Sequence, residues 1–118
     1  MRKGFFNKIK KTREMFESRQ IDRVILRELY KSYVNVADFD SFVSAAEKIF
    51  PTLNCGLASL YLKHSLKEGK VIQGSYKGNN HTFLMIDKNT IVDITADQYG
   101  GPAIYIGPLI SPWKIQPK

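Results

Sequence analysis

The chain contains a single cysteine, a single tryptophan and only two histidines among its 118 residues. One cysteine cannot form an internal disulfide, and small secreted domains usually contain several, so the sequence predicts a reducing, cytoplasmic setting. One cysteine and two histidines also supply too few of the preferred ligands for a closed zinc site. We therefore expect no metal and no other cofactor.

Long apolar runs are also missing. After the basic start at residues 1–6, the polar residues Asn7, Lys8, Lys10 and Lys11 interrupt the apolar stretch that a signal peptide needs. No segment approaches the roughly 18 apolar residues of a membrane span. The sequence predicts a soluble protein without a transmembrane segment.

Acidic residues are the scarcer charged class, with 11 Asp and Glu against 18 Lys and Arg, a net charge of +7 and a sequence pI near 9.6. Such a surface attracts nucleic acid, acidic proteins or anionic membranes at low salt, and charge alone does not choose among them. Hydrophobic residues make up 43% of the chain and charged residues 25%, which is typical of a globular protein. This length predicts a single domain.

The first half of the sequence has helical periodicity in residues 2–20, 21–33, 38–50 and 54–68. Asp38 or Asp40 is expected to cap the third helix, and Thr52 or Asn54 the fourth. Pro51 would end the third helix. The apolar positions expected to face the core are Phe5, Phe6, Ile9, Phe16, Ile21, Ile25, Leu29, Tyr33, Phe42, Val43, Ala46, Ile49, Phe50, Leu57, Leu60, Tyr61 and Leu66.

The pattern becomes extended after Gly69. Strands are predicted at residues 71–76, 81–87, 90–95 and 103–106, separated by turns rich in Gly, Asn and Lys. In the tail from residue 107, Trp113 is expected to anchor the chain to the body of the protein. Helices followed by a small antiparallel sheet make an α+β fold.

One cysteine, one histidine and one aspartate stand at positions that suit nucleophilic catalysis. Cys55 is expected in the first turn of the fourth helix, where free N–H groups and the helix dipole lower a thiol pKa. His81 heads a predicted strand and Asp93 lies in the next one. A thiol needs a base, and the base needs an acceptor that fixes its tautomer. Alternatively, Cys55 is an inert buried cysteine and His81 an ordinary strand-edge histidine.

The second histidine fits this site poorly. His64 lies nine residues beyond Cys55, on the far side of the predicted helix, so we expect it at the surface.

The register of the hairpin between the two strands decides whether His81 and Asp93 can meet. If only residues 88–89 form the loop, Asp87 faces Thr90, and Asp93 points to the opposite face of the sheet from His81. If Asp87 joins the loop, Asp93 shares a face with His81 as its diagonal neighbour. The catalytic hypothesis requires the second register.

Three segments resemble a known family: Asn54-Cys55-Gly56, Asn80-His81-Thr82-Phe83-Leu84 and residues 91–99, Ile-Val-Asp-Ile-Thr-Ala-Asp-Gln-Tyr. They are similar to the core of the papain-like and transglutaminase-like cysteine enzymes, as found in small bacterial and phage members. The resemblance covers roughly residues 52–106 as a catalytic core. It leaves residues 1–51 as a helical preface and residues 107–118 as a tail.

The resemblance implies a thiol hydrolase or acyltransferase that acts on amide bonds of a protein or peptide through a thioester. Cys55 would be the nucleophile at a helix N-terminus, His81 the general base and acid, and Asp93 the group that orients His81. The reaction would be peptide hydrolysis, glutamine deamidation or transglutamination. The setting would be the cytoplasm, or a host or target cell into which the protein is delivered as an effector.

The oxyanion donors are less well defined. The backbone N–H of Cys55 is one, and the side-chain amides of Asn54 and Gln98 are candidates for the second. The papain family places its oxyanion glutamine well before the nucleophile. In this chain the only glutamine that precedes Cys55 is Gln20.

Two other functions remain open. One is a non-catalytic basic module that binds nucleic acid or an acidic protein through the first helices, with a contact set of Lys8, Lys10, Lys11, Arg13 and Arg23. The other is an inactive member of the same fold, kept for its interactions. The oligomeric state cannot be read from the sequence.

Overall fold

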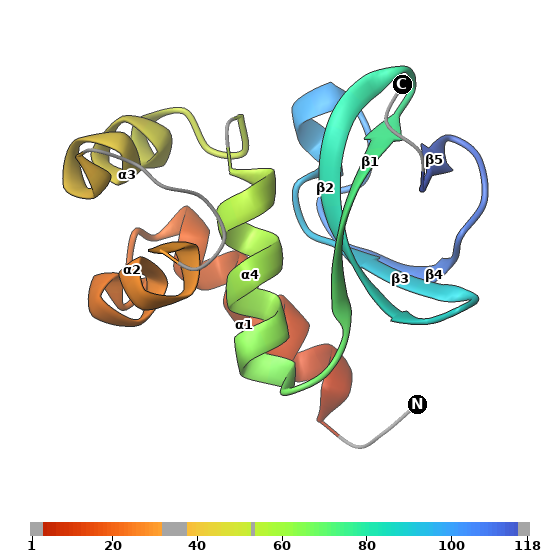
Figure 1. Cartoon of the computed structure of the whole chain (residues 1–118), viewed down its shortest axis with the longest axis horizontal. Coiled ribbons are helices and arrows are strands. Elements are labelled where there is room, and N and C mark those ends of the chain that lie inside the picture. Colours follow the sequence, from red (N-terminus) through yellow and green to blue (C-terminus); the bar gives the residue numbers. More distant parts are fainter. Residues whose placement is uncertain (1–3, 32–37, 53, 116–118) are drawn as a thin grey trace.

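Four helices precede a five-stranded antiparallel sheet in the described part of the chain, residues 4–31, 38–52 and 54–115 of this computed structural model (Figure 1). This order confirms the predicted α+β class. The helices are α1 (Phe5–Glu17), α2 (Arg23–Lys31), α3 (Phe39–Lys48) and α4 (Cys55–Leu66). The strands are β1 (Lys70–Tyr76), β2 (Asn79–Asp87), β3 (Thr90–Asp93), β4 (Tyr105–Pro108) and β5 (Trp113–Lys114), and a 3₁₀ helix, η1 (Ala96–Tyr99), follows β3.

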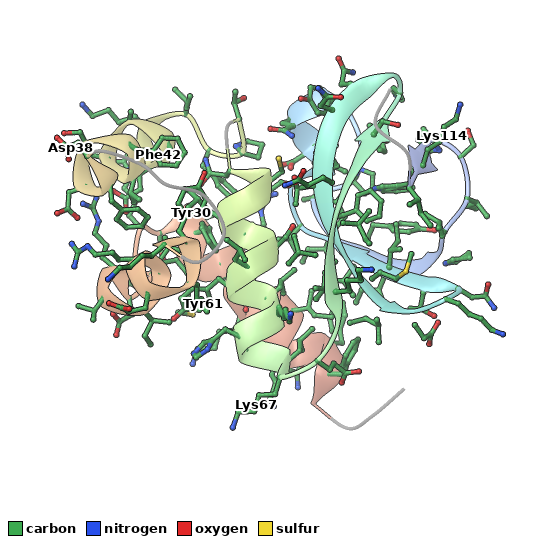
Figure 2. All side chains as sticks on the ribbon, viewed as in Figure 1. Tyr30, Asp38, Phe42, Tyr61, Lys67 and Lys114 are labelled. Atoms are coloured by element: carbon green, nitrogen blue, oxygen red, sulfur yellow. The ribbon has the colours of Figure 1, made fainter. Side chains whose placement is uncertain are left out.

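Helix α4 lies at the centre of the molecule, with the sheet on one side, helices α2 and α3 on the opposite side and α1 behind it (Figure 1). Leu57, Ala58 and Leu62 of α4 are buried in one cluster with Leu84 and Val92 of the sheet. Helices α2 and α3 pack on each other away from the sheet, where the rings of Tyr30 and Phe42 stack with centroids 5.6 Å apart (Figure 2). The ring of Phe39 lies tilted against Tyr30, with centroids 5.8 Å apart. The core therefore forms around the helix that begins at Cys55.

Several predicted helix features differ in the structure. Phe6 is 48% exposed, because it lies about 100° around the helix from the buried stripe of Phe5, Ile9 and Phe16. Helix α3 ends at Lys48, before Pro51, so Ile49 is the C-cap residue and is 45% exposed. Tyr33 lies outside the described residues.

Other helix predictions are confirmed or refined. Asp38 caps α3 by accepting a hydrogen bond from the backbone N–H of Ser41. In α2 the buried residue is Leu26, whereas Ile21, Ile25 and Leu29 pack partly buried against the same core. The periodicity thus predicted where the helices lie, but it assigned some residues to the wrong face of their helix.

The sheet has the strand order β4-β3-β2-β1-β5 and curls around a second apolar cluster. Leu84 of β2 faces the helices, while Phe83 packs into the second cluster with Tyr76 and Trp113. The two edge strands approach each other across this cluster, since the rings of Tyr105 and Trp113 stack with centroids 3.9 Å apart. The curl gives the sheet an enclosed inner face.

The strands differ from the prediction at their ends. Strand β2 begins at Asn79, inside the predicted turn, and β4 runs over Tyr105–Pro108 instead of residues 103–106. The two-residue strand β5 and the 3₁₀ helix η1 were not predicted. Trp113 is the buried anchor that the sequence indicated, at 5% exposure.

The hairpin between β2 and β3 has a two-residue loop. Asp87 pairs with Thr90, so the loop consists of residues 88–89 and Asp87 does not join it. The prediction that Asp87 joins the loop, on which the catalytic hypothesis depended, is therefore wrong.

A β-bulge nevertheless produces the required register. The pairing shifts between Met85 and Asp87, which leaves Ile86 as the extra residue, and Leu84 then faces Val92. This shift brings Asp93 onto the inner face of the sheet that also bears His81.

Candidate active site

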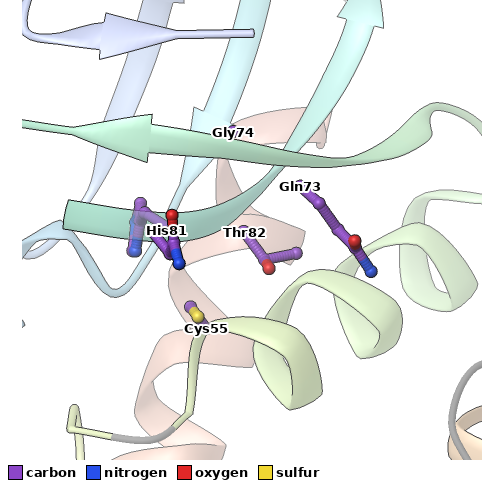
Figure 3. A pocket seen from close by; sticks show the side chains of 6 residues that line it. Cys55, Gln73, Gly74, His81 and Thr82 are labelled. Carbon is purple, nitrogen blue, oxygen red and sulfur yellow. The ribbon is translucent and has the colours of Figure 1, made fainter. Parts of the chain in front are cut away.

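Cys55 is the first residue of α4 and is partly buried. Figure 3 shows its side chain directed at strand β2, next to the ring of His81. The position at the start of α4 agrees with the sequence prediction. The N–H groups of this first turn have no partner within the helix, so they place partial positive charge near the sulfur.

His81 and Asp93 form a buried pair on the inner face of the sheet. The ring Nε2 of His81 lies 2.7 Å from Oδ2 of Asp93, and the two side chains are 0% and 1% exposed. Oδ2 also accepts a hydrogen bond from the indole N–H of Trp113 at 2.8 Å. Oδ1 accepts from the backbone N–H of Thr95 at 2.9 Å. Because an ionised carboxylate only accepts, Nε2 of His81 is the donor, and Nδ1 is left to face other groups.

The electrostatic surroundings favour a charged pair at Cys55 and His81. Burial raises the pKa of the Cys55 thiol, but hydrogen bonds from His81 and from the backbone N–H of Thr82, with the charge of His81, lower it, and the net shift is downward. Burial lowers the pKa of His81, but the hydrogen bonds and charges of Asp93 and Cys55 raise it to about 9. Each of the two groups thus favours the charged form of the other.

Gln98, a candidate oxyanion donor, lies against His81. Its side-chain Nε2 is 2.9 Å from Nδ1 of His81, and η1 carries the residue to this position after β3. The Gln98 amide thus contacts the ring nitrogen that Asp93 does not hold.

Asn54, the other candidate donor, is used differently. Its side-chain Nδ2 donates to the backbone carbonyls of Ala46 at 3.0 Å and Thr52 at 2.8 Å, and the residue is 2% exposed. An amide nitrogen has two hydrogens, and both are taken up here. Asn54 therefore ties α4 to the end of α3 and has no amide hydrogen left for an oxyanion.

A hollow of about 290 Å³ opens beside the sulfur (Figure 3). Apart from Cys55 and His81, its lining is uncharged and consists of Gln73, Gly74, Asn80 and Thr82. Gly74 is required where it stands, because a Cβ atom there would collide with the carbonyl oxygen of Lys114 in β5. The hollow can accept a neutral polar chain at the sulfur.

Two residues that support this site were not identified as such from the sequence. Trp113 was expected only as an anchor, but its N–H binds Asp93. Arg13 was expected in a basic contact surface, but it is 7% exposed and binds both carboxylate oxygens of Asp97 at 2.8 and 2.7 Å and the carbonyl of Ile94 at 2.7 Å. The signal that could have found Arg13 is its spacing, because it lies four residues after Ile9 and three before Phe16, on the buried face of α1.

The expected basic contact surface is smaller in the structure. Arg13 faces the interior, and Arg23 pairs with Glu47 at 2.6 Å, whereas Lys8, Lys10 and Lys11 remain exposed. His64 is exposed, as predicted. With Lys8, Lys11 and Lys67, it lines a second hollow of about 290 Å³ between α1 and α4.

Among the residues that the structure describes, no group of three or more histidine, cysteine or carboxylate side chains has the arrangement of a metal site. Within the same residues, no helix combines the length and apolarity needed to cross a membrane. In comparisons with protein-family models, curated proteins and solved structures, the chain has no match.

Proposed function

We propose that the protein is a cysteine-dependent acyl-transfer enzyme of the papain-like or transglutaminase-like kind. The observation that carries this proposal is the convergence of Cys55, at the start of α4, with the buried His81–Asp93 pair. A buried imidazole whose Nε2 is fixed by a carboxylate presents Nδ1 to the thiol in a single orientation. This arrangement performs nucleophilic catalysis.

The reaction would begin with attack of the Cys55 thiolate on an amide carbonyl carbon. A C–S bond forms, and the carbonyl oxygen becomes an oxyanion that the free backbone N–H groups at the start of α4 can stabilise. The C–N bond then breaks, and Nδ1–H of His81 protonates the departing amine. Water or a second amine, deprotonated by His81, attacks the thioester and releases the thiolate.

The substrate class follows from the hollow beside Cys55. Its neutral polar lining suits a protein or peptide chain. Peptide hydrolysis, glutamine deamidation and transglutamination share the same attack and differ in the leaving amine and the final acceptor. The reacting groups serve all three reactions.

An activated ester tests this proposal without knowledge of the substrate. With p-nitrophenyl acetate, we expect a burst of p-nitrophenolate and one acetyl group on Cys55 in the intact-mass spectrum. Cys55→Ala should abolish the acetylation. His81→Ala should lower the rate about 100-fold or more, because a positioned base contributes that much. The control His64→Ala, which removes the exposed histidine, should leave the rate unchanged. Equal Cys55 acetylation with and without His81 would refute the proposal.

A second candidate function, binding of an anionic partner, is favoured by the hollow between α1 and α4. Lys8, Lys11 and Lys67 surround it with His64, and within the described residues none of them has a carboxylate within ion-pair distance. Converging cations without partners attract phosphate or carboxylate groups. This function uses a surface separate from Cys55 and is compatible with the first.

A further inference from the structure

We propose that Gln98 is a positioning residue that stabilises both protonation states of His81 by turning its side-chain amide. Nε2 would donate to Nδ1 of the neutral imidazole, and Oε1 would accept from Nδ1–H of the imidazolium. This inference rests on the proposed function, in which Nδ1 of His81 exchanges a proton with Cys55 and with the leaving amine.

The hydrogen-bond assignments of the ring lead to this role. Asp93 holds Nε2 at 2.7 Å, so Nδ1 is the only ring nitrogen that can gain or lose a proton during the reaction. The Gln98 amide nitrogen lies 2.9 Å from that atom. An amide N–H can donate only to an unprotonated Nδ1, as in the neutral ring. Protonation of Nδ1 requires the amide to present its oxygen instead.

The backbone around Gln98 is fixed from both sides, while its side chain is only partly buried. On one side, Asp97 is clamped by the two-point contact with Arg13. On the other side, the hydroxyl of Tyr99 donates to the carbonyl of Asn80 at 3.2 Å. The backbone N–H of Gln98 itself donates to Thr95 at 3.1 Å. A fixed backbone and a partly exposed amide allow the amide to turn without moving η1.

Besides Gln98, few groups contact the His81 ring and influence its protonation state. Those that face His81 are Cys55 of α4, Asp93 of β3, Tyr76 of β1 and Tyr99 of η1. The rings of Tyr76 and Tyr99 meet the imidazole edge-on, with centroids 6.0 and 5.6 Å away. In this setting a neutral amide at residue 98 serves both charge states, whereas a carboxylate serves only the imidazolium.

NMR titration of His81 tests this role directly. In Gln98→Glu we expect the pKa of His81 to rise by about one unit above that of the wild type, because an opposite charge at hydrogen-bond distance favours the charged ring. In Gln98→Met, which supports neither state, the pKa should stay near the wild-type value while the rate of Cys55 acetylation falls. The spread of the backbone amide signals should match that of the wild type in every variant, which reports that the chain is folded.

Gln73→Glu is the matched control. It adds the same negative charge to the lining of the hollow, but the residue that contacts Nδ1 of His81 is Gln98. A shift in Gln98→Glu no larger than that in Gln73→Glu would overturn the role of Gln98. A His81 pKa that does not respond to Cys55→Ser would instead count against the proposed function, because it would show that the thiol and the imidazole are not coupled.

Discussion

Asp93 shows how much of the candidate site depends on single side chains. The carboxylate is 1% exposed, and its two oxygens accept hydrogen bonds from His81, Trp113 and Thr95. A buried carboxylate with this many donors holds its position. Asp93 therefore holds the ring of His81 in place, and Trp113 and Thr95 hold Asp93.

The sequence singled out Cys55, His81 and Asp93 as candidate site residues because their chemistry has few alternatives in this chain. Only one thiol is present, and of the two histidines only His81 precedes an aspartate on a neighbouring strand. Trp113 could not be connected to Asp93 in the same way. An indole N–H binds any nearby acceptor, and the fold alone decides that the acceptor is Asp93.

Trp113→Phe removes this hydrogen bond while keeping an aromatic ring between Tyr76 and Tyr105. We expect a loss of about 2 kcal/mol in the free energy of unfolding, because a buried carboxylate loses a donor. Urea denaturation measures it. The control Tyr105→Phe loses an exposed hydrogen bond to the carbonyl of Pro108 and should cost about 0.5 kcal/mol. Equal losses in the two variants would show that the indole N–H is not important.

Among the elements, the 3₁₀ helix η1 joins α1 to the candidate site. Arg13 of α1 reaches Asp97 of η1 and the carbonyl of Ile94, and its guanidinium carbon lies 4.6 Å from the ring centroid of Phe50. Gln98 follows Asp97 directly. The first helix therefore contributes to the placement of Gln98 as well as to the core.

Arg13→Ala should lower the free energy of unfolding by about 3 kcal/mol, because it leaves Asp97 and a buried carbonyl without their donor. Arg23→Ala is the matched control. Its ion pair with Glu47 is more exposed, with 35% of the arginine side chain accessible, and should contribute at most about 1 kcal/mol. Denaturation curves in urea compare the two variants, and an Arg13→Ala protein as stable as Arg23→Ala would contradict this account of η1.

Periodicity predicted the longer elements and failed for the short ones. The four helices and the strands β1, β2 and β3 each contain enough residues for a repeating pattern. Strand β5 has two residues, a single repeat of the strand period, and the four residues of η1 make little more than one three-residue turn, so neither contains a repeating signal. The sequence does not predict the bulge at Ile86, because one extra residue in the loop and one extra residue in the strand change the register equally. Either position places Asp93 on the same face of the sheet as His81.

In the whole molecule, the division into residues 1–51, 52–106 and 107–118 does not separate independent parts. Arg13 from the first segment binds Asp97 in the second, and Trp113 from the third binds Asp93 in the second. Both contacts lie close to the candidate site. The chain outside residues 52–106 therefore helps to build the site.

The excess of positive charge is concentrated in part on one surface, around the hollow between α1 and α4. We expect Lys8→Glu/Lys11→Glu to leave a heparin column at clearly lower salt than the wild type, because binding to a polyanion depends on the number of cations in contact. Lys70→Glu/Lys88→Glu makes the same change in net charge at exposed positions outside that hollow. If both double variants elute together, net charge alone explains the binding.

The pH profile of Cys55 alkylation tests the central claim most directly. A free thiol with a pKa of ~8.5 has about 0.3% thiolate at pH 6, and a lowered pKa of Cys55 raises that fraction. We expect iodoacetamide to modify wild-type Cys55 at pH 6 at least about tenfold faster than the His81→Ala variant. We also expect the midpoint of the profile to move toward ~8.5 in that variant. A wild-type midpoint near 8.5 that does not respond to His81→Ala would contradict a thiolate–imidazolium pair at Cys55 and His81.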